Sequence, residues 1–303
     1  MGHRQSPGYS RQRLLSSFAL IAAMVLWGSS FVAMKFAFAY LSPLVVIFGR
    51  MAVATVCFLP LIPSFCKISL SRKNLLPLMV MGLCEPCLYF LFEAAALQRT
   101  TASQASMITL MVAVASGMFL GERITRRTVV GFIVAAVGAL WLSMAGLVTD
   151  QAPEPMMGNF LEFMAMVSAT GYIILMKSLT KTLPSLFLTA MQAFIGTLFF
   201  GPLLLLPSVQ LPHDFSLPAL LSVLYLGTFV TIGAYGLYNY GVSRVWASQA
   251  AAYINLIPVM TLFFGFLLLG ERLTAWQVLA CCLVFLGVFL SQDSTPESRK
   301  RKG

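Results

Sequence analysis

The sequence predicts an all-α integral membrane protein with ten transmembrane helices, arranged as two inverted five-helix repeats with both termini in the cytoplasm. Three observations predict this fold: the hydropathy of the chain, the distribution of Lys and Arg among the loops, and a pair of motifs that occurs twice. The 303 residues are 59% hydrophobic and only 10% charged, whereas about 25% of the residues of a soluble chain are charged. The composition therefore excludes a soluble protein.

Ten apolar runs are long enough to cross the hydrocarbon core of a bilayer as helices, which takes about 20 residues each. The expected spans are 16–39, 44–66, 75–97, 101–120, 128–147, 158–179, 184–207, 217–241, 247–269 and 273–291. The first run follows a basic N-terminal segment but is too long for the core of a signal peptide, so we expect a retained first helix. Short connections make neighbouring spans antiparallel.

The positive charges orient these spans. One set of loops carries sixteen Lys and Arg residues, whereas the opposite set carries only Arg99 and Arg272. Since Lys and Arg gather on the cytoplasmic side, both termini are expected there, in a multi-pass membrane protein. The net charge of +10 is thus explained by topology rather than by nucleic-acid binding.

Cysteines and histidines give no sign of a metal or cofactor site. All six cysteines lie in or beside apolar runs, where cysteine usually acts as a small hydrophobic residue. Cys84 and Cys87 have C-x-x-C spacing, but no second pair with ligand spacing accompanies them. No metal ligands and no cofactor are predicted.

Two motifs recur in the same order. A-S-Q-A stands at 102–105 and again at 247–250, and G-E-R stands at 121–123 and again at 270–272. Both pairs bracket the fourth helix of a five-helix unit, which indicates a duplication. The expected parts are a tail at 1–15, a first repeat at 16–147, a linker at 148–157, a second repeat at 158–291 and a basic tail at 292–303.

Because five is odd, the second repeat must be inserted upside down relative to the first. Inverted repeats are typical of secondary transporters, in which two related halves rock about a site near the middle of the membrane. The same chain has none of the H-E-x-x-H, G-x-S-x-G or G-x-x-x-x-G-K-[ST] patterns of enzymes and nucleotide sites. We therefore expect no enzyme and no ATP-driven pump.

The chain resembles the drug/metabolite transporter superfamily, in particular its EamA-type ten-helix members. The resemblance covers about residues 16–291 and rests on the paired motifs, L-W-G-S-S-F-V-A-M-K at 26–35, Pro43 followed by Arg50, and 255–258 in the ninth span. It implies export of amino-acid-like or other amphipathic metabolites across a bacterial inner membrane. It also implies coupling to an ion gradient or to exchange.

One departure from the repeat is visible. Ala102 and Glu122 are 20 positions apart, whereas Ala247 and Glu271 are 24 apart. The first copy therefore lacks about one helical turn, or roughly 6 Å. A non-transporting, degenerate paralogue is for this reason an alternative reading, beside an equilibrative facilitator or channel.

Glu85 and Pro86 lie together near the middle of the third span. A carboxylate there costs about 2.5–3.5 kcal/mol on insertion scales, and proline removes a backbone hydrogen bond. Irregular backbone at that depth survives only against protein or a water-filled cavity. We expect a kink at this point, with Glu85 as the carrier of a coupling proton or as a structural acid.

Other polar and aromatic side chains are expected at similar depth. Glu93 lies about 12 Å further along the third span than Glu85, with Tyr89 between them. Lys35 and Arg50 could neutralise these acids as structural ion pairs or gate the substrate, and Arg50 could also bind a substrate carboxylate. Glu162 is expected to reach the outer surface from the start of the sixth span. Further candidates for the cavity wall are Trp27, Tyr235, Tyr238, Asn239 and Asn255.

Overall fold

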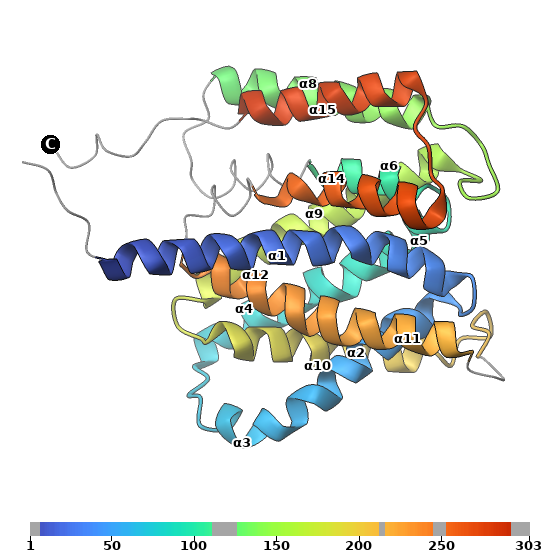
Figure 1. Cartoon of the computed structure of the whole chain (residues 1–303). Helices are drawn as coiled ribbons and strands as arrows, with labels where there is room; N and C mark the ends of the chain where they lie inside the picture. Colours follow the sequence, from blue (N-terminus) through green and yellow to red (C-terminus); the bar gives the residue numbers. More distant parts are fainter. Residues whose placement is uncertain (1–6, 111–125, 212–215, 245–252, 292–303) are drawn as a thin grey trace, which may run out of the picture.

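The computed structural model describes residues 7–110, 126–211, 216–244 and 253–291, and every regular element among them is helical (Figure 1). An isolated bridge between Thr149 and Ala152 is the exception to the helices. Within these described ranges, six stretches are long and apolar enough to cross a membrane, and shorter apolar helices accompany them. The long stretches are Leu14–Phe38, Pro43–Phe65, Arg72–Leu97, Pro155–Leu179, Ser185–Leu203 and Leu217–Val242.

The first half of the described chain ends with α8. Its elements are α1 (Pro7–Phe38), α2 (Pro43–Phe58), η1 (Leu59–Leu61), α3 (Ile62–Phe65), α4 (Arg72–Gly82), η2 (Leu83–Leu88), α5 (Tyr89–Leu97), α6 (Ala102–Ile108) and α8 (Arg126–Met144). Proline and serine stand at the starts of two of these helices. Pro43 begins α2, and the Ser71 side chain caps α4.

The second half begins with α9. Its elements are α9 (Pro155–Leu179), α10 (Ser185–Leu203), α11 (Leu217–Tyr225), η3 (Leu226–Ala234), α12 (Tyr235–Val242), α14 (Leu256–Phe264), η4 (Gly265–Leu269) and α15 (Ala275–Ser291). The left-handed backbone at Gly270, with φ of 66°, ends η4.

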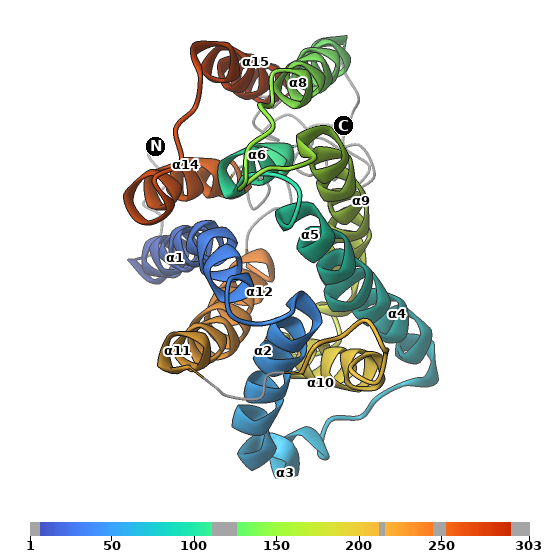
Figure 2. The same ribbon diagram turned by 90° about the vertical axis from the view of Figure 1, so that its right-hand side faces the viewer.

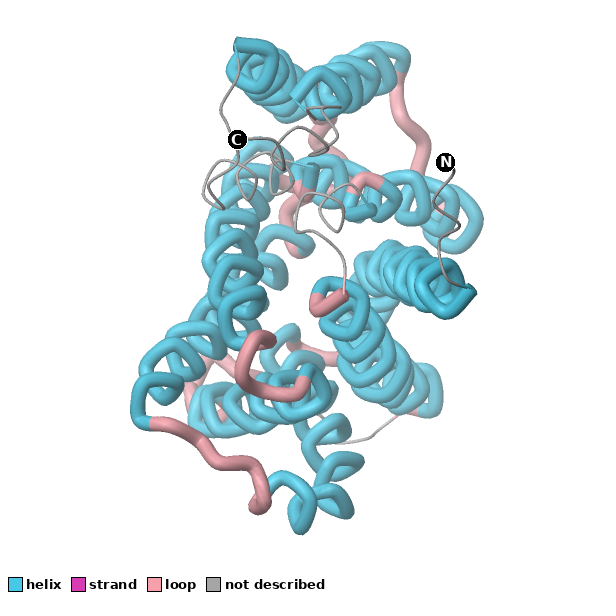
Figure 3. Tube along the Cα trace, turned by 90° about the vertical axis from the view of Figure 1, so that its left-hand side faces the viewer, coloured by secondary structure: helices cyan, strands magenta, loops and turns pink. Residues whose placement is uncertain are grey.

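The two halves are interleaved rather than side by side. The most extensive packing joins α8 with α15, α5 with α9, α1 with α14 and α2 with α10, and each pair takes one helix from each half. Viewed end-on, α8 and α15 form an outer pair, while the other helices surround a common centre (Figures 2 and 3). The buried centre of the molecule is therefore lined by both halves.

Two expected spans are described only in part. In the expected span 101–120, α6 ends at Ile108, and residues 111–125, which include the first G-E-R motif, lie outside the described residues. In the expected span 247–269, α14 begins only at Leu256, and the second A-S-Q-A motif likewise lies outside.

The third and eighth spans are both interrupted. The third is kinked within η2, where the backbone of Glu85 is not helical, and the eighth contains the π-helical stretch η3. The repeated A-S-Q-A motifs are 145 positions apart, at 102 and 247. Moved by that offset, η2 falls at 228–233, inside η3. The interruption therefore recurs at corresponding places in the two halves.

Candidate functional site

The expected break beside Pro86 is present. Glu85 has an extended backbone, with φ of −147° and ψ of 116°, between helical segments on either side. Its carboxyl group is buried at 5% exposure, and Oε1 accepts a hydrogen bond from the hydroxyl group of Tyr235 in α12. The break thus turns an acid of the first half toward the second half.

This acid lines a cavity between the two halves, with a free volume of about 60 Å³. Seven of the ten expected site residues line it: Trp27, Arg50, Glu85, Tyr89, Glu93, Tyr235 and Tyr238. Apolar side chains such as Phe31, Met166 and Ile173 complete the wall. A space of this size holds a few water molecules, so a larger solute requires the helices to move apart.

Arg50 places a guanidinium group at the cavity wall although its side chain is only 1% exposed. Its Nε donates to Thr231 Oγ1 at 3.0 Å and its Nη1 to Met34 Sδ at 3.3 Å. The ring of Phe90 lies 4.4 Å from the guanidinium carbon, a distance suited to a cation–π contact. No carboxylate of the described residues is within ion-pairing distance of Arg50, although Glu93 and Glu85 attract it electrostatically.

Glu93 is held from within its own helix. The hydroxyl group of Tyr89, one turn earlier in α5, donates to Glu93 Oε1 at 2.7 Å. The other oxygen, Oε2, is buried and has no hydrogen-bond partner in the described part of the chain. One side of this carboxyl group is therefore available to a ligand or a proton.

An aromatic cluster forms another wall of the cavity. The Trp27 ring centroid lies 4.7 Å from that of Tyr238 and 5.1 Å from that of Tyr235. Trp27 Nε1 and the Tyr238 hydroxyl group are buried without a hydrogen-bond partner among the described residues. Because buried polar groups in proteins are nearly always paired, these two donors indicate a site for a polar guest.

Three expected site residues lie outside the cavity wall. Lys35 donates to the backbone carbonyl of Gln151 in the loop before α9. Asn239 accepts from Tyr172 at 2.7 Å and donates to Thr189 at 2.8 Å, behind the cavity. Asn255 stands at the start of α14, and its buried Oδ1 has no hydrogen-bond partner among the residues that the structure describes.

The expectation for Glu162 is wrong. The side chain is fully buried at 0% exposure and does not reach the surface. The reason is that α9 begins at Pro155, three residues before the expected start of the span, so Glu162 lies about two turns inside the helix. Its face of α9 continues into Met166, Ala169 and Ile173, which line the cavity.

Sequence reasoning also missed Tyr172 and Thr231. Tyr172 is 1% exposed, lines the cavity and orients Asn239. Thr231 accepts from Arg50 and bonds back to the Leu226 carbonyl at 2.9 Å inside η3. Thr231 lies 145 positions after Pro86, and the two A-S-Q-A motifs are separated by the same number of positions. Thr231 is therefore the counterpart of Pro86 in the second repeat, and the repeat could have identified it as a candidate.

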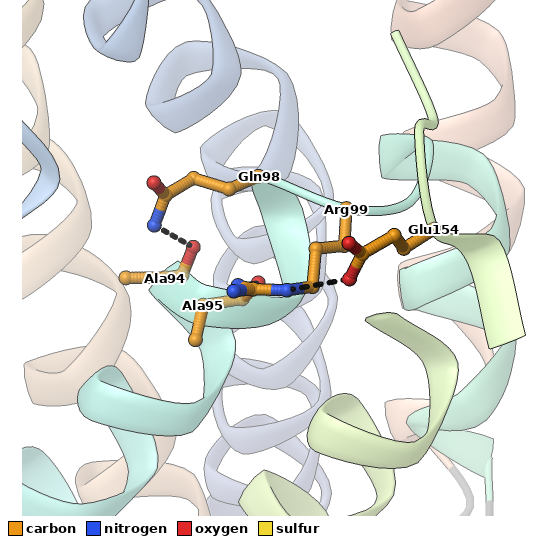
Figure 4. A network of polar contacts seen from close by, with 5 residues as sticks. All are labelled: Ala94, Ala95, Gln98, Arg99 and Glu154. Atoms are coloured by element: carbon orange, nitrogen blue, oxygen red, sulfur yellow. Dashed lines mark hydrogen bonds and ion pairs between the residues drawn. The ribbon is translucent and has the colours of Figure 1, made fainter. Parts of the chain in front are cut away.

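Several contacts between distant parts of the chain lie at the end of the molecule where α5 meets α9, here named the Arg99 end. Arg99 Nε pairs with Glu154 Oε2 at 3.2 Å, and its Nη1 donates to the Ala95 carbonyl at 2.8 Å (Figure 4). The Glu271 carboxylate reaches from the second half to the start of α6. There it accepts from the backbone N–H groups of Ala102 and Ser103, both at 2.9 Å, and from the Ser103 hydroxyl group at 2.5 Å.

A larger hollow of about 620 Å³ lies elsewhere, between α8 and the start of α15. Its lining includes Trp141 and Trp276 and contains no acidic or basic side chain. The two helices α8 and α15 form a pair at the edge of the molecule (Figure 2). We therefore assign the functional site to the smaller, charged cavity.

Comparison with known proteins accounts for nearly the whole chain. The family model described as the EamA-like transporter family matches twice, at residues 14–144 and 156–292. A relative from Archaeoglobus fulgidus, named an uncharacterized transporter, is 28% identical over 275 residues, which cover 89% of this chain and 96% of the relative. A relative from Salmonella typhimurium, named a probable amino-acid metabolite efflux pump, is 25% identical and covers 90% of this chain and 93% of its own.

A solved crystal structure supports the fold. It matches with a TM-score of 0.64 at 18% identity, over 93% of this chain and 96% of that chain.

Proposed function

Because the chain belongs to the EamA-like transporter family, we propose that it is a secondary transporter that exports small amphipathic metabolites by alternating access. The protein is a multi-pass membrane transporter for a small molecule, and its relatives are named as transporters rather than enzymes. The finer proposal is an amino-acid-like substrate, which the name of the Salmonella typhimurium relative supports. It further includes ten spans as two inverted repeats in a bacterial inner membrane, with both termini cytoplasmic.

The observation that carries this proposal is the set of unpaired polar atoms in a cavity shared by both halves. Trp27 Nε1, the Tyr238 hydroxyl group and Glu93 Oε2 are buried without partners in the described chain. Arg50 would hold a substrate carboxylate, since a guanidinium group binds carboxylates in a bidentate manner. Glu93 would accept an ammonium group, and Trp27 with Tyr238 would stack against the apolar part of the solute.

Glu85 is the proposed carrier of the coupling proton. It lies where the third span breaks, on the contact with Tyr235 of the other half. A rocking motion of the halves would change that contact, so the carboxyl group can exchange its proton with opposite sides of the membrane in the two states. Intramembrane acids are functional by default, because their burial is costly.

The test is transport in vesicles containing the purified protein, with a panel of metabolites at two pH values. We expect saturable exchange, and uphill flux when a pH gradient is imposed. Glu85→Gln should abolish the gradient-driven flux. The control is Glu154→Gln, which replaces an exposed acid at the Arg99 end and should leave the flux intact. If Glu85→Gln retains full gradient-driven flux, the coupling role is wrong, and flux that neither saturates nor runs uphill would indicate a facilitator.

A further inference from the structure

Two buried acids face each other where α5 packs on α9. At this contact the helices approach so closely that a Cβ on Gly158 would lie 3.1 Å from the Ala96 carbonyl oxygen. Glu93 lies one turn before Ala96 in α5, and Glu162 lies one turn after Gly158 in α9. Because α5 ends and α9 begins at the Arg99 end (Figure 1), both acids lie on the cavity side of this contact. Glu93 and Glu162 are 2% and 0% exposed.

Hydrogen bonding leaves this pair incomplete. Neither carboxyl oxygen of Glu162 has a partner within the described residues, and Glu93 Oε2 has none either. The two carboxyl groups interact electrostatically with each other, and both interact with the Tyr89 hydroxyl group. An ionised carboxylate without partners is very costly to bury, and such a group instead binds a proton.

The balance of charge leads to the same conclusion. At the cavity, the guanidinium group of Arg50 interacts with the buried carboxyl groups of Glu85 and Glu93, and Glu93 in turn interacts with the buried carboxyl group of Glu162. If all three were ionised, two negative charges would remain uncompensated inside the protein. Neutrality therefore requires two further positive charges, and Glu85 can hold only one as a proton.

Among the described residues, no charged group other than Arg50 and Glu85 stands beside the pair: Lys35 of α1, which also packs on α5, donates to the Gln151 carbonyl and interacts with Glu271 instead. In the described residues, α6 has no titratable side chain, and η2 adds only Glu85, Cys84 and Cys87. Helices α4 and α8 also pack on α9, and their basic side chains lie in their first turns, at the end of the molecule opposite the Arg99 end. Lys177 lies at that same opposite end, in the last turn of α9. These first-turn residues are Arg72, Lys73, Arg126 and Arg127.

We propose that Glu93 and Glu162 form an acid pair that holds one proton between α5 and α9, a second proton site beside Arg50 and distinct from Glu85. The inference deepens the proposed function and rests on it for its role in transport. In that role the pair adjusts the charge around Arg50, so that binding of an anionic solute group and binding of the proton reinforce each other.

The test is infrared difference spectroscopy of the purified protein in lipid, because a protonated carboxyl group has a carbonyl stretch that an ionised one lacks. At neutral pH we expect the bands of two protonated carboxyl groups. Glu162→Gln should remove one and Glu85→Gln the other, while the exposed control Glu154→Gln should remove neither. Circular dichroism and gel filtration establish that each variant is folded, and Glu162→Asp keeps an acid at the site if the glutamine variant does not fold.

Two results would overturn the proposal. In the first, the carboxyl bands of Glu162→Gln are the same as those of the wild type, so that Glu162 is ionised. In the second, the wild type lacks the carboxyl band assigned to the pair, and sodium ions raise the unfolding temperature of the wild type but not that of Glu162→Gln. The pair would then be a metal-cation site. The spectrum requires no transported solute. A chain that transports nothing but loses the band in Glu162→Gln would refute the proposed function and leave the proton site in place.

Discussion

Arg50 is a buried cation whose donors are only partly used. Nε and Nη1 have partners, whereas Nη2 makes no hydrogen bond with the described residues. Its contacts are a hydroxyl group, a thioether and an aromatic face rather than a carboxylate. A guanidinium group held in this way is oriented by its neighbours without being neutralised by them, and it keeps its affinity for an anionic group.

We therefore expect Arg50→Lys to weaken substrate binding although the charge is retained, since lysine cannot form a bidentate pair. Losing a charged hydrogen bond costs about 1.5–3 kcal/mol, which corresponds to a rise in KM of roughly ten- to a hundredfold. Concentration-dependent uptake into vesicles measures this. Arg244→Lys is the matched control, because Arg244 stacks on Tyr240 in an exposed position, 3.7 Å from the ring centroid. An unchanged KM in Arg50→Lys would exclude Arg50 as the substrate anchor.

Which acids are buried could be predicted only in part. Glu85 and Glu93 lie so deep in a long apolar run that small errors in the helix boundaries do not change their position. Glu162 stands near the start of its span, and there a shift of three residues decides between surface and interior. The pairing of Glu162 with Glu93 depends on the packing of α5 against α9, which no local pattern encodes.

At the scale of elements, Glu271 joins α6 to the end of the ninth span. Its carboxylate satisfies backbone donors at the N-terminus of α6 that the helix itself leaves unpaired, and the negative charge suits the positive end of the helix dipole. The contact with Ser103 connects residues 168 positions apart in the sequence, and Glu271 is buried, at 8% exposure. It thus fastens the first half to the second at the Arg99 end.

Glu271→Ala should destabilise the protein by about 1–3 kcal/mol, because it leaves buried N–H groups without an acceptor. Thermal unfolding in detergent, followed by circular dichroism, measures the loss. Glu154→Ala, which breaks an exposed ion pair, should cost only about 0–1 kcal/mol. Equal effects of the two substitutions would mean that the Glu271 contact contributes no more than a surface pair.

The elements themselves differed in how far the sequence predicted them. The break at Glu85 follows from the covalent chemistry of Pro86, so it could be predicted locally. The π-helical turn η3 contains no proline and was not predicted, although its position matches that of η2 through the repeat. G-E-R was recognised as a repeated motif, but the cap that Glu271 forms on α6 was not, since it requires the two halves to be folded together.

At the scale of the whole molecule, the interleaving of the halves explains why a site forms between them. Helices α1 and α2 of the first half pack on α14, α12 and α10 of the second, and α9 packs on α4 and α5. Neither half alone can enclose the cavity, because Arg50 and Glu85 come from one half and Tyr235 and Tyr238 from the other. Opening the cavity would therefore take a movement of helices from both halves, which is the kind of movement that the proposed alternating access involves.

The orientation of this assembly in the membrane is the last prediction. Sixteen Lys and Arg residues in one set of loops against two in the other place the Arg99 end outside the cell. In a background with the six cysteines replaced by alanine, Asp150→Cys should react with a membrane-impermeant maleimide on intact cells, because Asp150 is exposed at that end. Lys73→Cys, exposed at the start of α4, should react only after the membrane is opened. The reverse labelling pattern would invert the topology, and with it the side of the membrane on which the Arg99 end lies.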